Sequence, residues 1–320
     1  MVEQTKRYRR KTRQQNPKSS GFLVPKNLSE SDVESEEKAL REAFIWFDPD
    51  EVTKQDYDAL DRVPEAAVIE QPVPEPEAGP NYWPLLSRIT ANPLQMDRNL
   101  IITARRQDPS NAAFDVLRAR LFQALNEHGW KRVAITSPTR DCGKTFVSIN
   151  LAIALSRYEN CRTVLMDMDM RNPSIAKALE EQDVGSIGDY LRGLVPMTEQ
   201  FHRFAENDLN IGTNLAIAMN DRVEQFSSEL LQEPETRICI EEMERALKPD
   251  VMLFDLPPAL AHDDVMAFRD NFDGALLVID GTATTGSQVR EVMRRLGDDC
   301  PLLGVVLNKA EDATGEEYGY

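Results

Sequence analysis

The sequence predicts a three-layer α/β domain, in which helices cover both faces of a mostly parallel sheet. Two observations predict it: short apolar runs of strand length recur from about residue 100 onward, and segments with helical spacing alternate with them. The strands of a parallel sheet are buried on both faces, so they stand out as nearly continuous apolar runs. Right-handed crossovers between such strands build a domain of about 200 residues.

The predicted elements begin with a helix, because Phe114, Leu117, Leu121 and Leu125 recur at helical spacing. The predicted strands are residues 133–136, 163–166, 209–217, 251–254, 274–279 and 302–307. The predicted helices between them are residues 146–157, 238–247 and 287–296.

The first third of the chain has a different composition. A basic cluster within residues 1–20 is followed by an acidic stretch at 29–37 and by a Pro- and Glu-rich stretch at 64–84. Such segments bury too little apolar surface to offset their ordering entropy, so residues 1–99 are predicted to be a largely disordered extension. Apolar spacing allows one short helix at 37–46. The basic cluster is compatible with acidic lipid headgroups, although a solvated tail is the preferred interpretation.

The charge balance and the cysteines restrict the class of protein. The chain has 37 Lys and Arg against 54 Asp and Glu, a net charge of −17, which argues against a general nucleic-acid binder. We find no apolar run of the about 18 residues that a membrane helix needs, and no secretory signal. The four cysteines are widely spaced without a C-x-x-C pair, which predicts reduced thiols in a soluble intracellular protein.

The strongest motif is Ser137-Pro-Thr-Arg-Asp-Cys-Gly-Lys-Thr145, which lies between a predicted strand and a predicted helix. A helix N-terminus offers unpaired N–H groups to an anion, and Gly143 lets the backbone approach phosphates closely. Lys144 can reach the β- and γ-phosphates, and the Thr145 hydroxyl can bind Mg²⁺. The strict phosphate-loop pattern has Gly at position 138, where this chain has Pro138. A Gly-Lys-Thr helix start without a ligand is the alternative.

Three carboxylates support the phosphate-loop interpretation. Asp167 and Asp169 follow one apolar strand at a spacing of two, and Asp255 ends another. Strand spacing places the first two on the same side, at the sheet edge where α/β proteins bind ligands. Three carboxylates at one edge are costly without a cation, and Mg²⁺ bound to phosphate oxygens is a suitable one.

From about residue 101 to 310, the sequence resembles the cytoplasmic kinase domain of the bacterial tyrosine kinases (BY-kinases) that control exopolysaccharide export. These kinases belong to the P-loop superfamily, together with the Min/Par-type partition ATPases. Residues 137–145 resemble the variant Walker A motif, 164–171 the acidic Asp-x-Asp-x-Arg box, and 252–258 the Walker B motif. Residues 186–191 and 304–309 resemble two further family segments. Thr139 stands where the partition ATPases have an extra lysine, which favours the kinase branch.

The resemblance implies ATP and Mg²⁺ as cofactors and assigns roles to single residues. Lys144, Asp167, Asp169 and Asp255 are the implied catalytic residues, with Asp167 accepting the proton of a tyrosine hydroxyl. Thr145, Asp169 and Asp255 are the implied metal-binding residues. The implied nucleotide-binding residues are Pro138, Thr139, Arg140, Asp141, Cys142, Gly143, Lys144, Thr145, Phe146, Arg171 and Asn308. Asn308 would contact adenine, and Arg171 either neutralises phosphate charge or forms a salt bridge with the preceding acids.

The sequence departs from the family pattern at two places. The helix that promotes ring assembly usually carries Glu-x-x-Arg-x-x-Arg, of which only Arg118 remains, with Asp115 in place of a cation. An Asp115–Arg118 pair on one helix face is the simpler expectation. A flexible acidic tail, residues 311–320, carries Tyr318 and Tyr320 as candidate autophosphorylation sites where the family usually has a larger tyrosine cluster.

The resemblance also implies a setting in the cell. It implies a cytoplasmic protein recruited to the inner face of the membrane by a separate chain-length-regulator (polysaccharide co-polymerase) partner, and a homo-oligomer. The leading hypothesis is an ATP-dependent tyrosine autokinase that regulates exopolysaccharide synthesis or export. The alternatives are an ATP-binding switch or adaptor ATPase without kinase activity, and a partition-type ATPase, which the negative charge disfavours as a non-specific DNA binder.

Overall fold

The computed structural model describes residues 80–101, 110–298 and 300–310, and these residues contain one eight-stranded sheet. The order across the sheet is β1-β4-β5-β3-β6-β2-β7-β8. The strands are β1 (Ser87–Ile89), β2 (Arg132–Thr136), β3 (Thr163–Asp167), β4 (Phe201–Phe204), β5 (Leu215–Ala218), β6 (Val251–Asp255), β7 (Gly274–Asp280) and β8 (Leu302–Asn308). The β4–β5 pair is antiparallel and every other neighbouring pair is parallel, so β1 and β4 run against the other six strands. The predicted mostly parallel sheet is confirmed.

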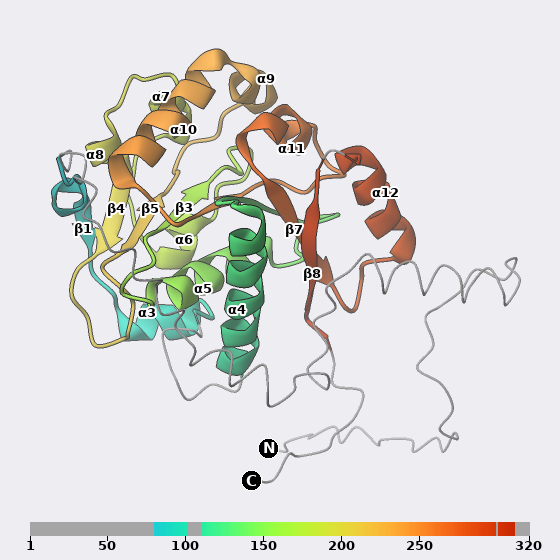
Figure 1. Cartoon of the computed structure of the whole chain (residues 1–320), viewed down its shortest axis with the longest axis horizontal. Helices are drawn as coiled ribbons and strands as arrows, with labels where there is room; N and C mark the ends of the chain where they lie inside the picture. Colours follow the sequence, from blue (N-terminus) through green and yellow to red (C-terminus); the bar gives the residue numbers. More distant parts are fainter. Residues whose placement is uncertain (1–79, 102–109, 299, 311–320) are drawn as a thin grey trace, which may run out of the picture. The chain divides into compact units, whose positions relative to one another are not determined.

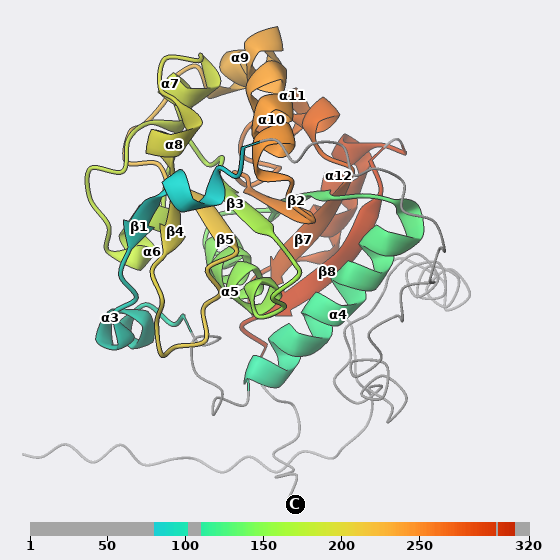
Figure 2. The same cartoon turned by 60° about the vertical axis from the view of Figure 1, so that its left-hand side comes forward.

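Helices lie on both faces of this sheet (Figures 1 and 2). Those on one face are α3 (Pro93–Arg98), α4 (Ser110–His128), α5 (Lys144–Ser156) and α6 (Ile175–Leu179). Those that pack on the other face include α7 (Ile187–Leu191), α9 (Ser227–Gln232), α10 (Pro234–Leu247), α11 (Asp264–Ala267) and α12 (Gly286–Leu296). The short elements are η2 (Trp83–Leu85), α8 (Met197–Gln200) and η4 (Arg269–Asn271). The result is the predicted three-layer arrangement.

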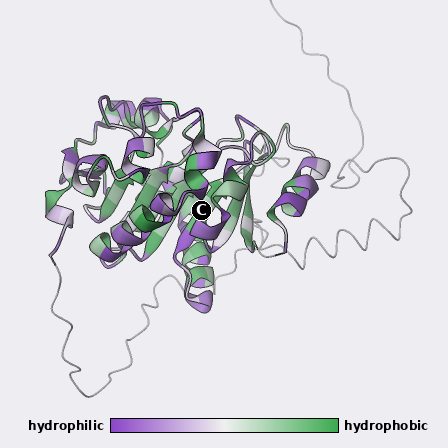
Figure 3. Cartoon of the chain, turned by 90° about the horizontal axis from the view of Figure 1, so that it is seen from above, coloured by the Kyte–Doolittle hydropathy of each residue, from purple (hydrophilic) through white to green (hydrophobic). Residues whose placement is uncertain are grey.

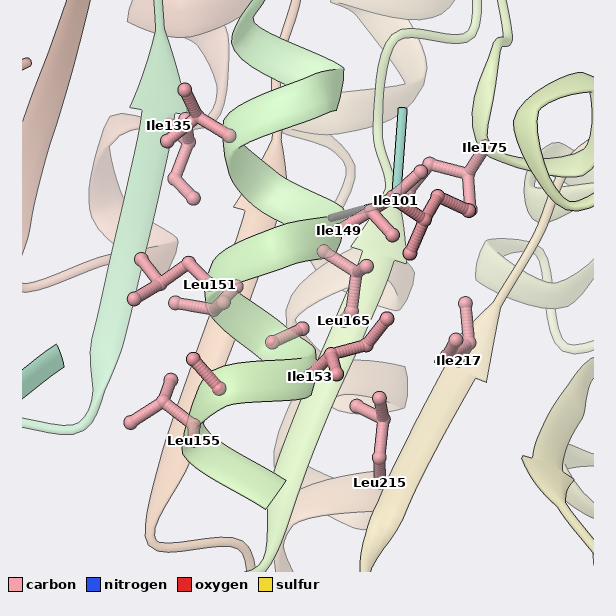
Figure 4. Packing of buried hydrophobic residues seen from close by; sticks show 14 of the residues in the cluster. Ile101, Ile135, Ile149, Leu151, Ile153, Leu155, Leu165, Ile175, Leu215 and Ile217 are labelled. Carbon is pink, nitrogen blue, oxygen red and sulfur yellow. The ribbon is translucent and has the colours of Figure 1, made fainter. Parts of the chain in front are cut away.

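Two hydrophobic cores lie on opposite faces of the sheet, because successive strand residues point to opposite sides. In β2, Val133 and Ile135 face the α5 side, whereas Ala134 faces the α10 side. Figure 4 shows Leu151, Ile153 and Leu155 of α5 on the strand side of the helix, in the first core. Helix α5 is buried on all sides from Val147 to Ser156, because it lies between the sheet and α4. Figure 3 shows hydrophobic strands between helices that carry their hydrophilic residues outward.

The prediction of a disordered chain up to residue 99 is wrong for residues 80–99. Strand β1 extends the sheet by pairing with β4, and α3 begins at an Asn92 side chain that accepts hydrogen bonds from Leu94 N and Gln95 N. Trp83 and Met96 are buried in the two cores, which offsets the ordering entropy of this short segment. The remaining part of the predicted extension, with its candidate helix at 37–46, lies outside the described residues.

We expect Trp83→Ala to lower the free energy of unfolding by about 3–5 kcal/mol, since it empties a buried site. The Trp83 side chain fills the second core, and its Nε1 donates to the Leu247 carbonyl at the end of α10 over 2.8 Å. The matched control is Leu85→Ala in the same turn, a residue that is 62% exposed, with an expected cost below about 0.5 kcal/mol. Urea unfolding measures both. Equal stability of the two variants would show that this turn does not belong to the folded unit.

Most other predicted elements are confirmed within a few residues, with one exception. The strand predicted at 209–217 is formed only as β5, because Asn207 turns the preceding chain by accepting from Leu209 N and Ile211 N. All four cysteines are free, as predicted, and burial raises the pKa of the Cys161 thiol to about 11. Among the described residues, no helix is long and apolar enough to span a membrane.

Candidate functional site

The loop between β2 and α5 runs from the end of a buried strand to the N-terminus of a helix, the position that a phosphate-binding loop occupies. Helix α5 begins at Lys144, directly after Gly143, whose φ of 89° lies in the left-handed region. A Cβ on Gly143 would lie 2.1 Å from Asn308 Nδ2 and displace that side chain, and the left-handed φ of 89° itself favours glycine. The N-terminal N–H groups of the 13-residue helix α5 lie at this loop, where they can bind an anion.

Neighbouring segments hold the loop on two sides. On one side, the carbonyls of Ser137 and Pro138 accept from Ala259 N and Leu260 N over 2.8 and 3.2 Å, which ties the loop to the segment after β6. The Ser137 hydroxyl also donates to the Thr139 carbonyl over 2.7 Å. Pro138 and Thr139 therefore belong to the part of the loop that these bonds hold in place. Neither residue lines the pocket described below.

On the other side, the end of β8 contacts the loop. Asn308 Nδ2 donates to the Cys142 carbonyl over 2.9 Å, and Lys309 Nζ donates to the Asp141 carbonyl. Lys309 also pairs with Asp280 at the end of β7 over 3.0 Å. Hydrogen bonds from Thr282, together with Lys309, lower the pKa of Asp280 to about 2. These bonds fix the backbone of the loop that the sequence assigned to phosphate binding.

Lys144 lies between two of the predicted carboxylates. Its Nζ is 2.7 Å from Asp169 Oδ2 and 3.8 Å from Asp255 Oδ1. Thr145 Oγ1 donates to Asp255 Oδ2 over 2.6 Å, and the register of β3 and β6 pairs Asp167 with Asp255. Burial opposes the charge on Lys144, but Asp255 and Asp169 outweigh it and raise its pKa. The predicted meeting of the carboxylates and Lys144 at one sheet edge is confirmed.

Asp167, like Asp255, is fully buried and does not line the pocket described below. Its Oδ2 accepts from Ser174 N and Ile175 N at the start of α6 over 3.0 and 2.9 Å. Its Oδ1 is buried without a hydrogen-bond partner among the described residues. Burial raises the pKa of Asp167 to about 8, and the Asp255 carboxylate adds to the rise. Asp167 therefore shapes the electrostatics beneath the site.

A pocket opens over the loop and receives most of the predicted residues. The predicted residues that line it are Arg140, Asp141, Gly143, Lys144, Thr145, Phe146, Asp169 and Arg171. The predicted residues outside the lining are Pro138, Thr139, Cys142, Asp167, Asp255 and Asn308. Sequence reasoning missed five lining residues, namely Asn172, Ser174, Pro257, Pro258 and His262. The sequence does contain a clue to Ser174, because it follows a proline where a helix begins. In the structure its hydroxyl lies 2.8 Å from Thr145 Oγ1. Tyr318 and Tyr320 lie outside the described residues.

The donor set suits a magnesium ion that also binds phosphate oxygens. The described residues contain no group of three or more His, Cys, Asp or Glu side chains arranged to hold a metal by themselves. The Thr145 hydroxyl is hydrogen-bonded to Asp255 next to a helix N-terminus that can bind an anion. Such oxygen donors suit a hard cation that also keeps water and phosphate ligands. These residues fit Mg²⁺ together with a nucleoside triphosphate.

A comparison with models of protein families shows which family the chain belongs to. Residues 133–318 match the model of the CobQ/CobB/MinD/ParA nucleotide binding domain, which is more than half of the chain. The chain belongs to this nucleotide-binding family. Within the family, its relatives identify it as a member of the BY-kinase branch, as the resemblance implied.

Two curated relatives and one solved structure illustrate this branch. The tyrosine-protein kinase YwqD of Bacillus subtilis is 26% identical over 71% of this chain and 92% of its own length. The tyrosine-protein kinase etk of Escherichia coli is 26% identical over 67% of this chain, but the match spans only 29% of that longer relative. The solved kinase domain of Escherichia coli ETK has a TM-score of 0.57 at 25% identity, covering 67% of this chain and 81% of that one.

Arg118, the one residue retained from the ring-assembly pattern, makes contacts within its own chain. Arg118 pairs with Asp115 over 3.2 Å, as expected for neighbours on one helix face. Its Nη1 also donates to the Ala154 carbonyl over 3.1 Å, and its guanidinium lies 4.4 Å from the Tyr158 ring centroid. Arg118 therefore fastens α4 to α5, and its side chain is only 11% exposed.

Proposed function

We propose that the protein is an ATP-dependent protein-tyrosine kinase that phosphorylates its own chain and regulates exopolysaccharide synthesis or export. One observation carries the proposal: Lys144, Asp169 and the Thr145–Asp255 pair meet at the start of α5, beside a pocket. The family is a nucleotide-binding one, and the relatives reported above carry the name of tyrosine kinase. ATP with Mg²⁺, when bound, supplies the phosphoryl group that is transferred.

The residues of this chain would position the phosphates and neutralise their charge, which is most of what phosphoryl transfer requires of a protein. Lys144 and the loop amides would hold the β- and γ-phosphates. Thr145 would bind Mg²⁺ directly, with Asp169 and Asp255 acting on it directly or through its waters. With ATP bound, Lys144 would exchange its present Asp169 partner for phosphate oxygens. Asn308 would contact adenine from the end of β8.

Asp167 remains the proposed acceptor of the tyrosine proton, on the condition that the site opens toward it. Its unpartnered Oδ1 provides an acceptor once the carboxyl is ionised, and burial, which raises its pKa to about 8, means that the nucleotide-free protein must first lose this proton. Asp167 is also buried and does not line the pocket. This burial favours a second candidate function, in which the protein binds and hydrolyses ATP as a switch or adaptor without phosphorylating tyrosine.

Incubation with Mg-ATP separates the two candidates. The purified chain is incubated alone and with a fragment of a membrane activator, and phosphotyrosine and released phosphate are both measured. Phosphotyrosine on the protein supports the kinase, whereas phosphate release without phosphotyrosine supports the switch. Absence of both, together with no nucleotide uptake by calorimetry, would refute both proposals.

We expect the double variant Tyr318→Phe and Tyr320→Phe to lose most of the autophosphorylation signal while keeping ATP hydrolysis. These two tyrosines end an acidic tail, and neither belongs to the loop or the carboxylate cluster. The control is Tyr158→Phe, which removes a hydroxyl at a partly exposed position two residues after the end of α5. Phosphopeptide mapping measures the result. An undiminished signal in the double variant would place the acceptor tyrosine elsewhere.

The proposed setting follows from the family. We propose a cytoplasmic protein that a chain-length-regulator partner recruits to the inner face of the membrane, and that assembles as a homo-oligomer. The internal bonds of Arg118 support an assembly that does not use this side chain as a contact.

A further inference from the structure

Arg171 is held at one edge of its guanidinium group. Its Nε lies 3.1 and 2.9 Å from the two carboxylate oxygens of Asp264, the first residue of α11. Its Nη2 reaches the Ser228 hydroxyl only at 3.5 Å, and its Nη1 has no hydrogen-bond partner among the described residues. The Arg171 side chain is 26% exposed and lines the pocket that Lys144 also lines.

Asp264 is a rigid support for this arginine. It is 1% exposed, and its Oδ1 also accepts a hydrogen bond from the buried Ser227 hydroxyl at the start of α9. Three segments therefore meet at this carboxylate: the chain after β3, the start of α9 and the start of α11. The exposed neighbour Asp263 makes no side-chain capping bond to α11.

We propose that Asp264 is a positioning residue that turns the Nη edge of Arg171 toward the terminal phosphoryl group of the nucleotide. An arginine presents two parallel donors to an oxyanion when its Nη groups are unengaged, and here a buried carboxylate engages mainly its Nε. The inference rests on the proposed function, because it assumes a nucleoside triphosphate in the pocket. If the Arg171–Asp264 pair served only to stabilise the fold, breaking it would change the affinities for ADP and for ATP equally.

The test compares the affinities for ADP and for a non-hydrolysable ATP analogue by calorimetry with Mg²⁺. We expect Asp264→Asn to weaken the ATP analogue by about tenfold, because its amide cannot accept from Arg171 as the carboxylate does. The affinity for ADP should change by less than about twofold, which also reports that the variant is folded. Arg171→Ala should lose the same preference for the triphosphate, and the double variant should lose no more than Arg171→Ala alone. Asp263→Asn is the matched control.

The outcomes are separable. Equal weakening of ADP and the ATP analogue in Asp264→Asn, or full retention of both affinities, overturns the positioning role. An additive loss in the double variant also overturns it. If the unmodified chain binds neither nucleotide, the proposed function itself has failed. If Asp264→Asn does not fold, Ser227→Ala replaces it, with an expected two- to threefold loss confined to the ATP analogue and the same overturning outcomes.

Discussion

We expect Lys144→Met to lower ATP turnover by at least about 1,000-fold. The ammonium group is the cation closest to the carboxylate cluster in the described structure, and charge neutralisation dominates phosphoryl transfer. Methionine has a similar length and no branching, so it fills the space of the lysine stem at the start of α5. The variant leaves Asp169 without its partner at 2.7 Å, so folding is checked alongside activity.

The matched control for this prediction is Lys177→Met on α6, where the lysine is exposed and lies outside the pocket lining. It makes the same chemical change without touching the cluster, and its turnover should remain within about twofold of the unmodified chain. Phosphate release under Mg-ATP measures both variants. Turnover retained in a folded Lys144→Met protein would mean that the loop does not carry the proposed chemistry.

The central strands were predictable because they are buried on both faces. Strands β2, β3 and β6 read as apolar runs, since nearly every residue in them is inaccessible to water. Strands β1 and β4 were missed for the opposite reason. Strand β1 has three residues of which two are exposed, and β4 carries His202 and Arg203 between its buried ends. A strand that is short and half polar has no apolar run to detect, whether it lies at the edge, as β1 does, or next to it, as β4 does.

The site was predictable where the chemistry lies within one motif, and less so where it depends on distant pairs. The loop, Lys144 and Thr145 are contiguous, and the carboxylates end recognisable strands. Strand spacing suggested equivalent places for Asp167 and Asp169, but β3 ends at Asp167. Beyond that point the alternation no longer applies, so Asp167 binds the start of α6 while Asp169 pairs with Lys144.

The partner of Arg171 illustrates the second limit. The sequence left open whether Arg171 neutralises phosphate charge or forms a salt bridge with the preceding acids, and the structure pairs it with Asp264, 93 residues away. Both residues stand beside recognisable motifs, but their contact depends on how α9 and α11 pack against the end of β3. Spacing along one chain contains no information about such a contact.

We expect Asp167→Asn to reduce the fall in stability of the nucleotide-free protein between about pH 5 and 8. An unfolded aspartate releases its proton near pH 4, whereas the folded Asp167 has a pKa raised by burial to about 8. Between these values the folded state holds a proton that the unfolded state has lost. The contribution of Asp167 to the free energy of unfolding is therefore greatest below about pH 4 and falls as pH rises, by up to about 1.4 kcal/mol per pH unit.

The asparagine variant removes this titration and keeps the local bonds, because its carbonyl oxygen can still accept from Ser174 N and Ile175 N. Urea unfolding in EDTA at several pH values measures the slope. Asp183→Asn, an exposed neighbour on the loop after α6, serves as the control and should leave the slope unchanged. A slope that is the same in Asp167→Asn and the unmodified chain would contradict the prediction.

The same variant connects stability with function. At pH 8 we expect Asp167→Asn to be more stable than the unmodified chain, because it no longer places an ionisable carboxyl with an unpartnered Oδ1 in a buried position beside Asp255. If the variant loses phosphotransfer while its stability rises, then Asp167 destabilises the folded protein but is needed for the reaction. If stability and phosphotransfer both rise or stay constant, Asp167 is not the base, and the ATP-binding switch becomes the better description of this protein.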